Sequence, residues 1–130
     1  KLKILLNLLA GNKIIMTNSV NQHCNTVLNR LGIDKCFNSV LTRNDMKNIK
    51  PHPQTYYKVI KNCNVKSNDK CIFFDDQPIN LIMAKKFGWI TVLITPEPWK
   101  YRQSHKNIDF VFPSVHYAIA YLVKKMYKIK

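Results

Sequence analysis

The sequence is poor in acidic residues, in glycine and in long apolar runs. Seven aspartates and glutamates stand against 21 lysines and arginines, and the 130 residues include only three glycines and six prolines. No apolar run reaches the roughly 18 residues that cross a bilayer, which argues against a membrane span. The hydrophobic share of 46% argues against a disordered chain. A chain of this length is expected to form one globular domain.

The four cysteines do not have the spacing of a zinc site. Cys24, Cys36, Cys63 and Cys71 form no C-x-x-C pair, which is the usual signature of structural zinc. We therefore expect reduced thiols and a location in the cytoplasm or the nucleus.

The excess of positive charge suggests an anionic partner. A net charge of +14 and an isoelectric point near 9.8 would attract nucleic acid, an anionic surface or a small anionic substrate. The lysines are scattered, however, and no run of five or more basic residues marks a nucleic-acid site. A small anionic substrate is therefore favoured, and a basic nucleic-acid-binding domain is kept as an alternative.

Helical and extended patterns alternate along the chain. Apolar residues three and four apart predict helices, and short apolar runs predict strands. The expected helices are residues 2–9, 20–31, a segment beginning just after Pro53, 78–87 and 115–126, and the expected strands are 13–17, 37–41, 71–74, 89–94 and 109–112. This order predicts a Rossmann-like, doubly wound parallel α/β sheet. Ligands of such sheets bind beyond the carboxyl ends of the strands.

The most informative motif is the pair Asp75-Asp76, which follows the apolar strand 71–74. Two adjacent carboxylates repel each other and resist burial, so a bound cation is the simplest way to offset that cost. Mg²⁺ fits, because it binds one or two carboxylates together with water and substrate phosphate. The alternative is that one carboxylate caps the helix beginning near Pro78. Asn80 extends the polar cluster with a neutral group.

Two further polar segments are expected near strand ends. Thr17 and Asn18 stand between a strand and a helix, where a hydroxyl and free N–H groups can hold a phosphate oxygen; the alternative is a simple helix cap. Lys50 precedes Pro51-His52-Pro53, and the prolines would hold its ammonium group in a fixed place that suits a phosphoryl group. The alternative is a solvated surface lysine. In a doubly wound sheet these segments and the carboxylate pair would converge on one rim.

Together these segments resemble a known set of motifs. Residues 15–19, 50–56 and 72–76, the last followed by Asn80, resemble the second, third and fourth motifs of the haloacid dehalogenase-like hydrolase superfamily. The intervals between them are similar as well, and the resemblance extends over residues 2–94. Within the superfamily the sequence is most similar to the pyrimidine 5'-nucleotidase-like phosphatases, which carry a similar Thr-Asn, Lys-Pro-His and Asp-Asp-x-x-x-Asn pattern.

The resemblance implies a Mg²⁺-dependent phosphatase of small phosphate esters, such as a nucleotide 5'-monophosphatase. Thr17 and Asn18 would bind the phosphoryl group, and Lys50 would neutralise charge between this group and the nucleophile. Asp75 and Asp76 would hold Mg²⁺, and Lys50 and Asp76 would be catalytic. In the superfamily the nucleophile is an aspartate that forms a phospho-aspartyl intermediate, which water then hydrolyses.

One part of the superfamily pattern is not found in these 130 residues. The first motif, Asp-x-Asp, should precede Thr17, but the first acidic residue of the chain is Asp34. We therefore expect residues 1–130 to be a partial core domain without the nucleophile, the first-motif strand or the cap. The strands ending at Thr17 and Phe74 would then lack a common neighbour, so the segment should be unstable alone or depend on another chain. The alternative is a non-catalytic relative that binds phosphate or a partner; substrate identity and oligomeric state are not predicted.

Overall fold

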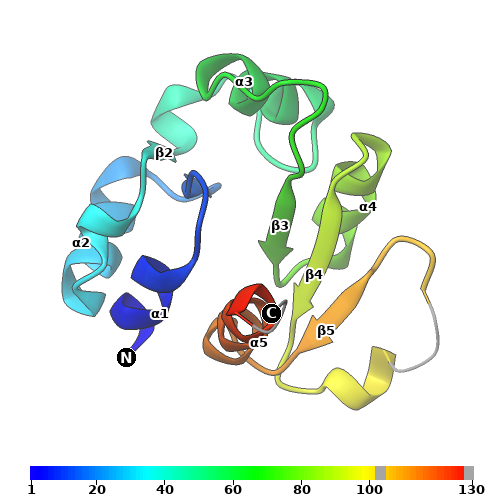
Figure 1. The fold of residues 1–130 in the computed structure, drawn as a ribbon. Coiled ribbons are helices and arrows are strands. Elements are labelled where there is room, and N and C mark those ends of the chain that lie inside the picture. Colours follow the sequence, from blue (N-terminus) through cyan, green and yellow to red (C-terminus); the bar gives the residue numbers. More distant parts are fainter. Residues whose placement is uncertain (102–104, 128–130) are drawn as a thin grey trace. The chain divides into compact units, whose positions relative to one another are not determined.

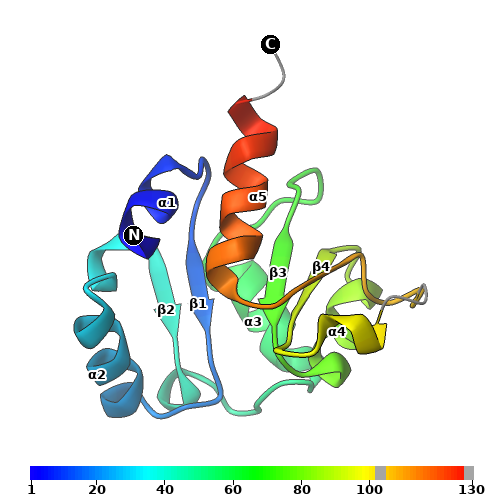
Figure 2. The same ribbon diagram turned by 90° about the horizontal axis from the view of Figure 1, so that it is seen from below.

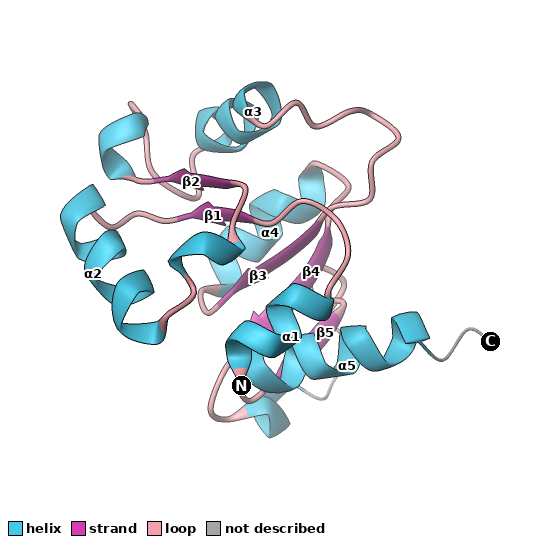
Figure 3. Ribbon diagram, turned by 60° about the vertical axis from the view of Figure 1, so that its left-hand side comes forward, coloured by secondary structure: helices cyan, strands magenta, loops and turns pink. Residues whose placement is uncertain are grey.

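The computed structural model describes residues 1–101 and 105–127. The chain divides into two compact units, Lys1–Asn68 and Asp69–Lys130. Helices and strands alternate within both units (Figure 3), in the order that the sequence predicts. None of the described helices is both long enough and apolar enough to span a bilayer. The interpretation of residues 1–130 as a single partial domain stays a prediction.

The first unit contains two short parallel strands. β1 (Ile14–Met16) lies beside β2 (Ser39–Leu41), with Ile14 opposite Ser39 and Met16 opposite Leu41 (Figure 2). The helices of this unit are α1 (Leu2–Leu8), α2 (Asn21–Leu31) and α3 (Pro53–Asn62), and the 3₁₀ turns η1 (Asp34–Cys36) and η2 (Arg43–Asp45) precede and follow β2. The chain leaves α2 at Gly32, whose left-handed backbone (φ 69°) favours glycine and ends the helix where the sequence predicts.

The second unit contains a three-stranded parallel sheet. Its strands β3 (Ile72–Asp75), β4 (Ile90–Ile94) and β5 (Phe110–Phe112) lie in the order β3-β4-β5 (Figure 1). Helix α4 (Pro78–Lys86) connects β3 to β4, the 3₁₀ turn η3 (Pro98–Tyr101) follows β4, and α5 (Val115–Tyr127) follows β5. The central strand carries the most deeply buried residues of the sheet, Thr91, Val92 and Leu93. A strand buried on both faces is typical of a parallel sheet covered by helices.

The predicted α/β fold with parallel strands is confirmed. In the described part of the chain the strands form two separate sheets, so β1 pairs with β2 alone and β3 pairs with β4 alone. The expectation that a strand between β1 and β3 is missing stays a prediction. Strand β3 also runs one residue further than predicted, so Asp75 is itself the last residue of the strand.

Candidate functional site

The turn after β1 is shaped by Thr17. The Thr17 N–H donates to the Leu41 carbonyl (3.0 Å) and so extends the β1–β2 ladder, while its Oγ1 accepts a hydrogen bond from the Ser19 N–H (3.1 Å). The residue before α2 is Val20, which makes no side-chain cap. Thr17 therefore holds a turn and does not cap the helix. The Thr17 hydroxyl proton has no acceptor among the described residues, so it can be donated to a ligand oxygen.

The next residue, Asn18, joins this turn to Lys50. Its Nδ2 donates to the Lys50 carbonyl (3.3 Å), and the Lys50 N–H donates to its Oδ1 (2.9 Å). Both residues are half-buried. Two segments that sequence reasoning singled out, 32 residues apart, thus lie together in the first unit.

The rest of the segment that leads to Lys50 is also attached to the turn. The Arg43 N–H donates to the Ser19 carbonyl (2.9 Å), and the Asn21 N–H donates to Asn44 Oδ1 (2.6 Å). The 3₁₀ turn η2 begins with a capping box, in which the Thr42 N–H donates to the Asp45 carboxylate (2.8 Å). Lys50 therefore stands at the end of a loop that is fixed at several points.

His52, the residue between the two prolines, has a structural role. It is the N-cap of α3, and its Nδ1 accepts a hydrogen bond from the Gln54 N–H (3.1 Å). Proline at the first position of α3 suits a helix start, because its missing N–H would have no partner there. The Pro-His-Pro sequence thus serves to begin α3 immediately after Lys50.

In the second unit the carboxylate pair splits into a buried and an exposed member. Asp75 has 9% of its surface exposed, whereas Asp76 is exposed. The Asp75 Oδ1 accepts from the Gln77 N–H (2.8 Å), and Nδ2 of the buried Asn80 lies 3.3 and 3.2 Å from its two carboxylate oxygens. The N-cap of α4 is Gln77, without a side-chain cap. Neither aspartate therefore caps α4.

The donor set of this cluster fits Mg²⁺ and not zinc. Its oxygen atoms come from two carboxylates, and Mg²⁺ is commonly bound by one or two carboxylates with water and substrate completing the octahedron. Among residues 1–101 and 105–127, no group of three or more His, Cys, Asp or Glu side chains could enclose a metal ion. A closed structural site would need such a group.

Two hollows on the surface of the described residues do not coincide with the predicted site residues. One, of about 320 Å³, lies in the first unit beside the start of α3, and the other, of about 290 Å³, borders α4 in the second unit. The first is lined by Met46, Lys47, Asn48, Gln54, Thr55 and Lys58, and the second by Pro78, Ile82, Tyr101, His105, Lys106, Asn107 and Ile108. Neither hollow is lined by Thr17, Lys50 or the carboxylate pair, so the side-chain chemistry and not a hollow indicates the candidate site.

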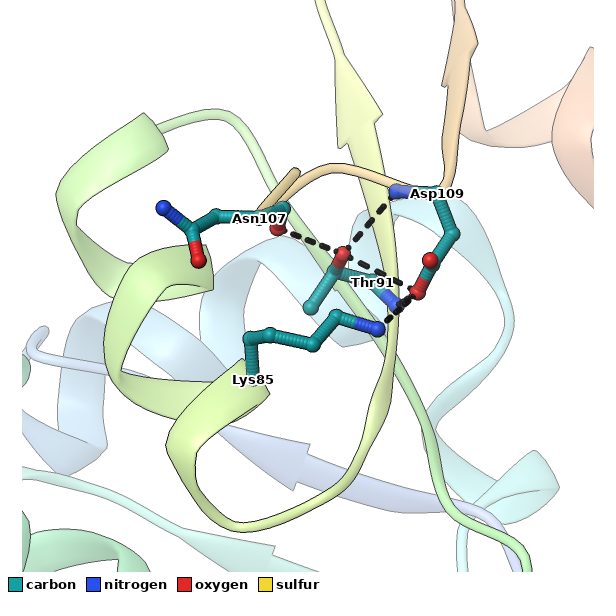
Figure 4. Close-up of polar contacts among 4 residues, drawn as sticks. All are labelled: Lys85, Thr91, Asn107 and Asp109. Carbon is teal, nitrogen blue, oxygen red and sulfur yellow. Dashed lines mark hydrogen bonds and ion pairs between the residues drawn. The ribbon is translucent and has the colours of Figure 1, made fainter. Parts of the chain in front are cut away.

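A second polar cluster, which sequence reasoning missed, surrounds the fully buried Thr91 (Figure 4). Its hydroxyl donates to the Asn107 carbonyl (2.8 Å) and accepts from the Asp109 N–H (3.1 Å), and its own N–H donates to the Asp109 carboxylate (2.8 Å). Lys85 forms an ion pair with the same carboxylate. Partial burial alone would raise the pKa of Asp109, but the hydrogen bonds from Lys85 and Thr91 and the charge of Lys85 lower it below the ordinary value.

This cluster lies at the end of the sheet opposite to the carboxylate pair. Thr91 is the second residue of β4 and Asp109 directly precedes β5, whereas Asp75 ends β3. Ligands of parallel α/β sheets bind at the carboxyl ends of the strands, so the Thr91 cluster is structural. The one signal in the sequence is the presence of an aspartate before a strand in a chain with so few acidic residues.

One family model matches most of this chain. The family model described as "Haloacid dehalogenase-like hydrolase" matches residues 4–94, which include both polar segments of the first unit and the carboxylate pair of the second. The chain belongs to the haloacid dehalogenase-like hydrolase family. The predicted superfamily is thereby confirmed, whereas the pyrimidine 5'-nucleotidase subgroup and the roles of the individual site residues stay predictions.

Solved structures of this hydrolase family share the fold. The L-2-haloacid dehalogenase of Xanthobacter autotrophicus with chloropropionic acid covalently bound matches at 17% identity and a TM-score of 0.72, over 98% of this chain and 60% of that one. A predicted phosphoglycolate phosphatase of Haemophilus somnus matches at 22% identity and a TM-score of 0.72, over 95% of this chain and 55% of that one. A hydrolase of the same superfamily from Ehrlichia chaffeensis matches at 17% identity and a TM-score of 0.70, over 95% of this chain and 56% of that one.

The matched structures are longer than this chain. The chain spans about half the length of the structures it resembles, for example 46% and 48% of two dehalogenase chains. The dehalogenases and phosphatases among them catalyse different reactions. At these identities the likeness shows the fold, and the reaction has to be argued from the side chains.

Proposed function

We propose that this chain carries the phosphate-binding and metal-binding segments of a Mg²⁺-dependent phosphatase that acts on small phosphate esters. The intact protein, meaning this chain with any sequence that adjoins it in the natural gene product, would hydrolyse its substrate through a phospho-aspartyl intermediate. The nucleotide 5'-monophosphatases are the subgroup whose motifs it resembles, so a nucleoside 5'-monophosphate is the first substrate to test.

The observation that carries the proposal is the pairing of Asn18 with Lys50. It puts a cationic residue beside the Thr17 turn, whose hydroxyl proton has no acceptor in the described part of the chain. A hydroxyl donor and an ammonium group suit the oxygens of a phosphoryl group, where negative charge collects. Thr17 and Lys50 would bind these oxygens directly.

In the second unit Asp75 and Asp76 would hold Mg²⁺. When bound there, the ion would polarise a phosphoryl oxygen and offset negative charge. Asp76, which is exposed, is the carboxylate free to turn toward a ligand, and Asn80 with the Gln77 N–H fixes the plane of the Asp75 carboxylate. The excess of basic residues further supports an anionic substrate.

The nucleophile is the part that these 130 residues do not provide. No acidic residue precedes Asp34, whereas the proposed reaction needs an aspartate in an Asp-x-Asp motif before the Thr17 segment. We propose that this motif lies in adjoining sequence. An open reading frame that continues upstream without such a motif would favour the non-catalytic alternative.

The test is hydrolysis of p-nitrophenyl phosphate and nucleoside 5'-monophosphates by the intact protein with Mg²⁺. We expect Asp76→Ala to abolish release of product, and Asp34→Ala, which changes an exposed aspartate outside the proposed site, to leave the rate unchanged. Release of chloride from 2-chloropropionate without phosphatase activity would replace the proposal by a dehalogenase function. Full phosphatase activity of Asp76→Ala would refute the assignment of the metal site.

A further inference from the structure

The side-chain amide of Asn18 is engaged at both of its polar ends by the main chain of a single residue, Lys50. The nitrogen donates to the Lys50 carbonyl at 3.3 Å, and the oxygen accepts from the Lys50 N–H at 2.9 Å. A residue that bound phosphate through its amide would present the amide nitrogen to the ligand. Here that nitrogen points at the backbone of Lys50.

We infer that the Asn18 side chain is a positioning group for Lys50 and not itself a phosphate ligand. The inference rests on the proposed function and refines it: Thr17 and Lys50 contact the phosphoryl oxygens, and Asn18 fixes the point from which the Lys50 side chain extends. A lysine side chain has four rotatable methylene groups and loses considerable rotamer entropy when it is held. An anchored backbone reduces the number of places that the ammonium group can reach.

The neighbouring contacts show that this anchor is local. The same loop is attached to the turn by the Arg43 N–H on the Ser19 carbonyl and by the Asn21 N–H on Asn44 Oδ1. These two bonds do not involve Asn18 or Lys50. Removing the Asn18 amide should therefore detach Lys50 from the Thr17 turn, while the remainder of the loop stays attached and the unit stays folded.

A double-mutant cycle separates a positioning residue from an independent ligand. The measured quantity is the affinity of the intact protein for inorganic phosphate, in the wild type, Asn18→Ala, Lys50→Ala and the double variant. Loss of a charge-assisted hydrogen bond in Lys50→Ala should weaken phosphate binding about 10- to 100-fold, and Asn18→Ala should weaken it about 5-fold. Because Asn18 acts through Lys50, adding Asn18→Ala to Lys50→Ala should change the affinity by less than about 2-fold.

Asn38→Ala is the matched control. Asn38 lies in the same unit, and its Oδ1 likewise accepts from a backbone N–H, that of Lys13 at 2.7 Å. This contact lies before β1 and β2, away from the Thr17 turn. We expect Asn38→Ala to bind phosphate as the wild type does. If it weakens phosphate binding as much as Asn18→Ala, the effect of Asn18 is general destabilisation of the unit and the inference is wrong.

The remaining outcomes are distinct. If Asn18→Ala weakens phosphate binding equally with and without the Lys50 side chain, Asn18 is a ligand in its own right, and the inference fails while the proposed function stands. If the wild type does not bind phosphate at all, the proposed function fails and the inference fails with it. Amide hydrogen exchange at Lys50 provides a readout without ligand: exchange should accelerate in Asn18→Ala, and unchanged exchange would show that the two bonds do not form in solution.

Discussion

Replacing Thr91 by valine should destabilise the second unit by about 2 kcal/mol. Valine has nearly the same shape as threonine but no hydroxyl group, and Thr91 is fully buried, so the substitution removes a hydroxyl group from an enclosed position. The substitution leaves two backbone groups without their partner, the Asn107 carbonyl and the Asp109 N–H. A buried or partly buried group left unpaired costs about 1–3 kcal/mol, and we take about 1 kcal/mol for each because both lie near the surface.

The measurement is urea unfolding of the intact protein, combined with native-state hydrogen exchange at the Asp109 amide. The exchange experiment is needed because two compact units can unfold separately, and the single midpoint of a two-state analysis would then not belong to either. The Asp109 N–H is the donor to Thr91 Oγ1, so its exchange reports the site that is changed.

Thr26→Val is the control for this substitution. Thr26 is exposed on α2, and its hydroxyl donates to the Gln22 carbonyl at 2.9 Å. Water can replace that bond, and threonine and valine have similar helix propensities, so the change should lie within about 0.5 kcal/mol. A loss below about 0.5 kcal/mol for Thr91→Val, or an equal loss for Thr26→Val, would refute the reasoning.

Three further predictions concern acid, metal and nucleic acid. The lowered pKa of Asp109 means that its carboxylate stabilises the fold above the unfolded-state pKa of about 3.9, and that this stability is lost as the pH falls through the lower folded-state pKa. In Asp109→Asn, the free energy of unfolding measured in urea should therefore fall less steeply with acid than in the wild type. An unchanged acid profile would contradict this. Removal of divalent ions by EDTA should abolish phosphatase activity and shift the unfolding midpoint of the second unit little, whereas its complete unfolding would reveal a structural metal. Binding of a random-sequence oligonucleotide should be weak and fall steeply with salt; tight binding that resists salt would revive the nucleic-acid alternative.

The positions of the helices and strands could be predicted because their boundaries are marked by local signals. Gly32 ends α2, proline begins α3 and α4, and a short apolar run marks β3. Each signal acts through the backbone conformation of one or two residues, so it can be read without knowing the tertiary structure. The family could be predicted for the same reason, since its motifs follow directly after such boundaries.

The contacts of the candidate site could not be predicted in this way. The bonds between Asn18 and Lys50 depend on how a loop of some thirty residues closes, which no local pattern specifies. The resemblance to the family implied a phosphate-binding role for Asn18, and no local pattern indicated that its side-chain amide contacts the backbone of Lys50. The Thr91 cluster escaped notice because a threonine within an apolar strand reads as an ordinary β-branched residue.

The structure also changes the physical argument for a metal ion. From the sequence, a bound cation is the simplest way to offset the repulsion between two adjacent carboxylates at the end of a buried strand. Asp75 accepts hydrogen bonds from the Gln77 N–H and Asn80, which offset part of the cost of its burial, and Asp76 is exposed to water. These contacts lower the cost of two adjacent carboxylates at a strand end, so that cost alone does not argue for a metal ion. The case for Mg²⁺ rests on the oxygen donors and on the resemblance to the family motif, and both assign the ion to the proposed reaction.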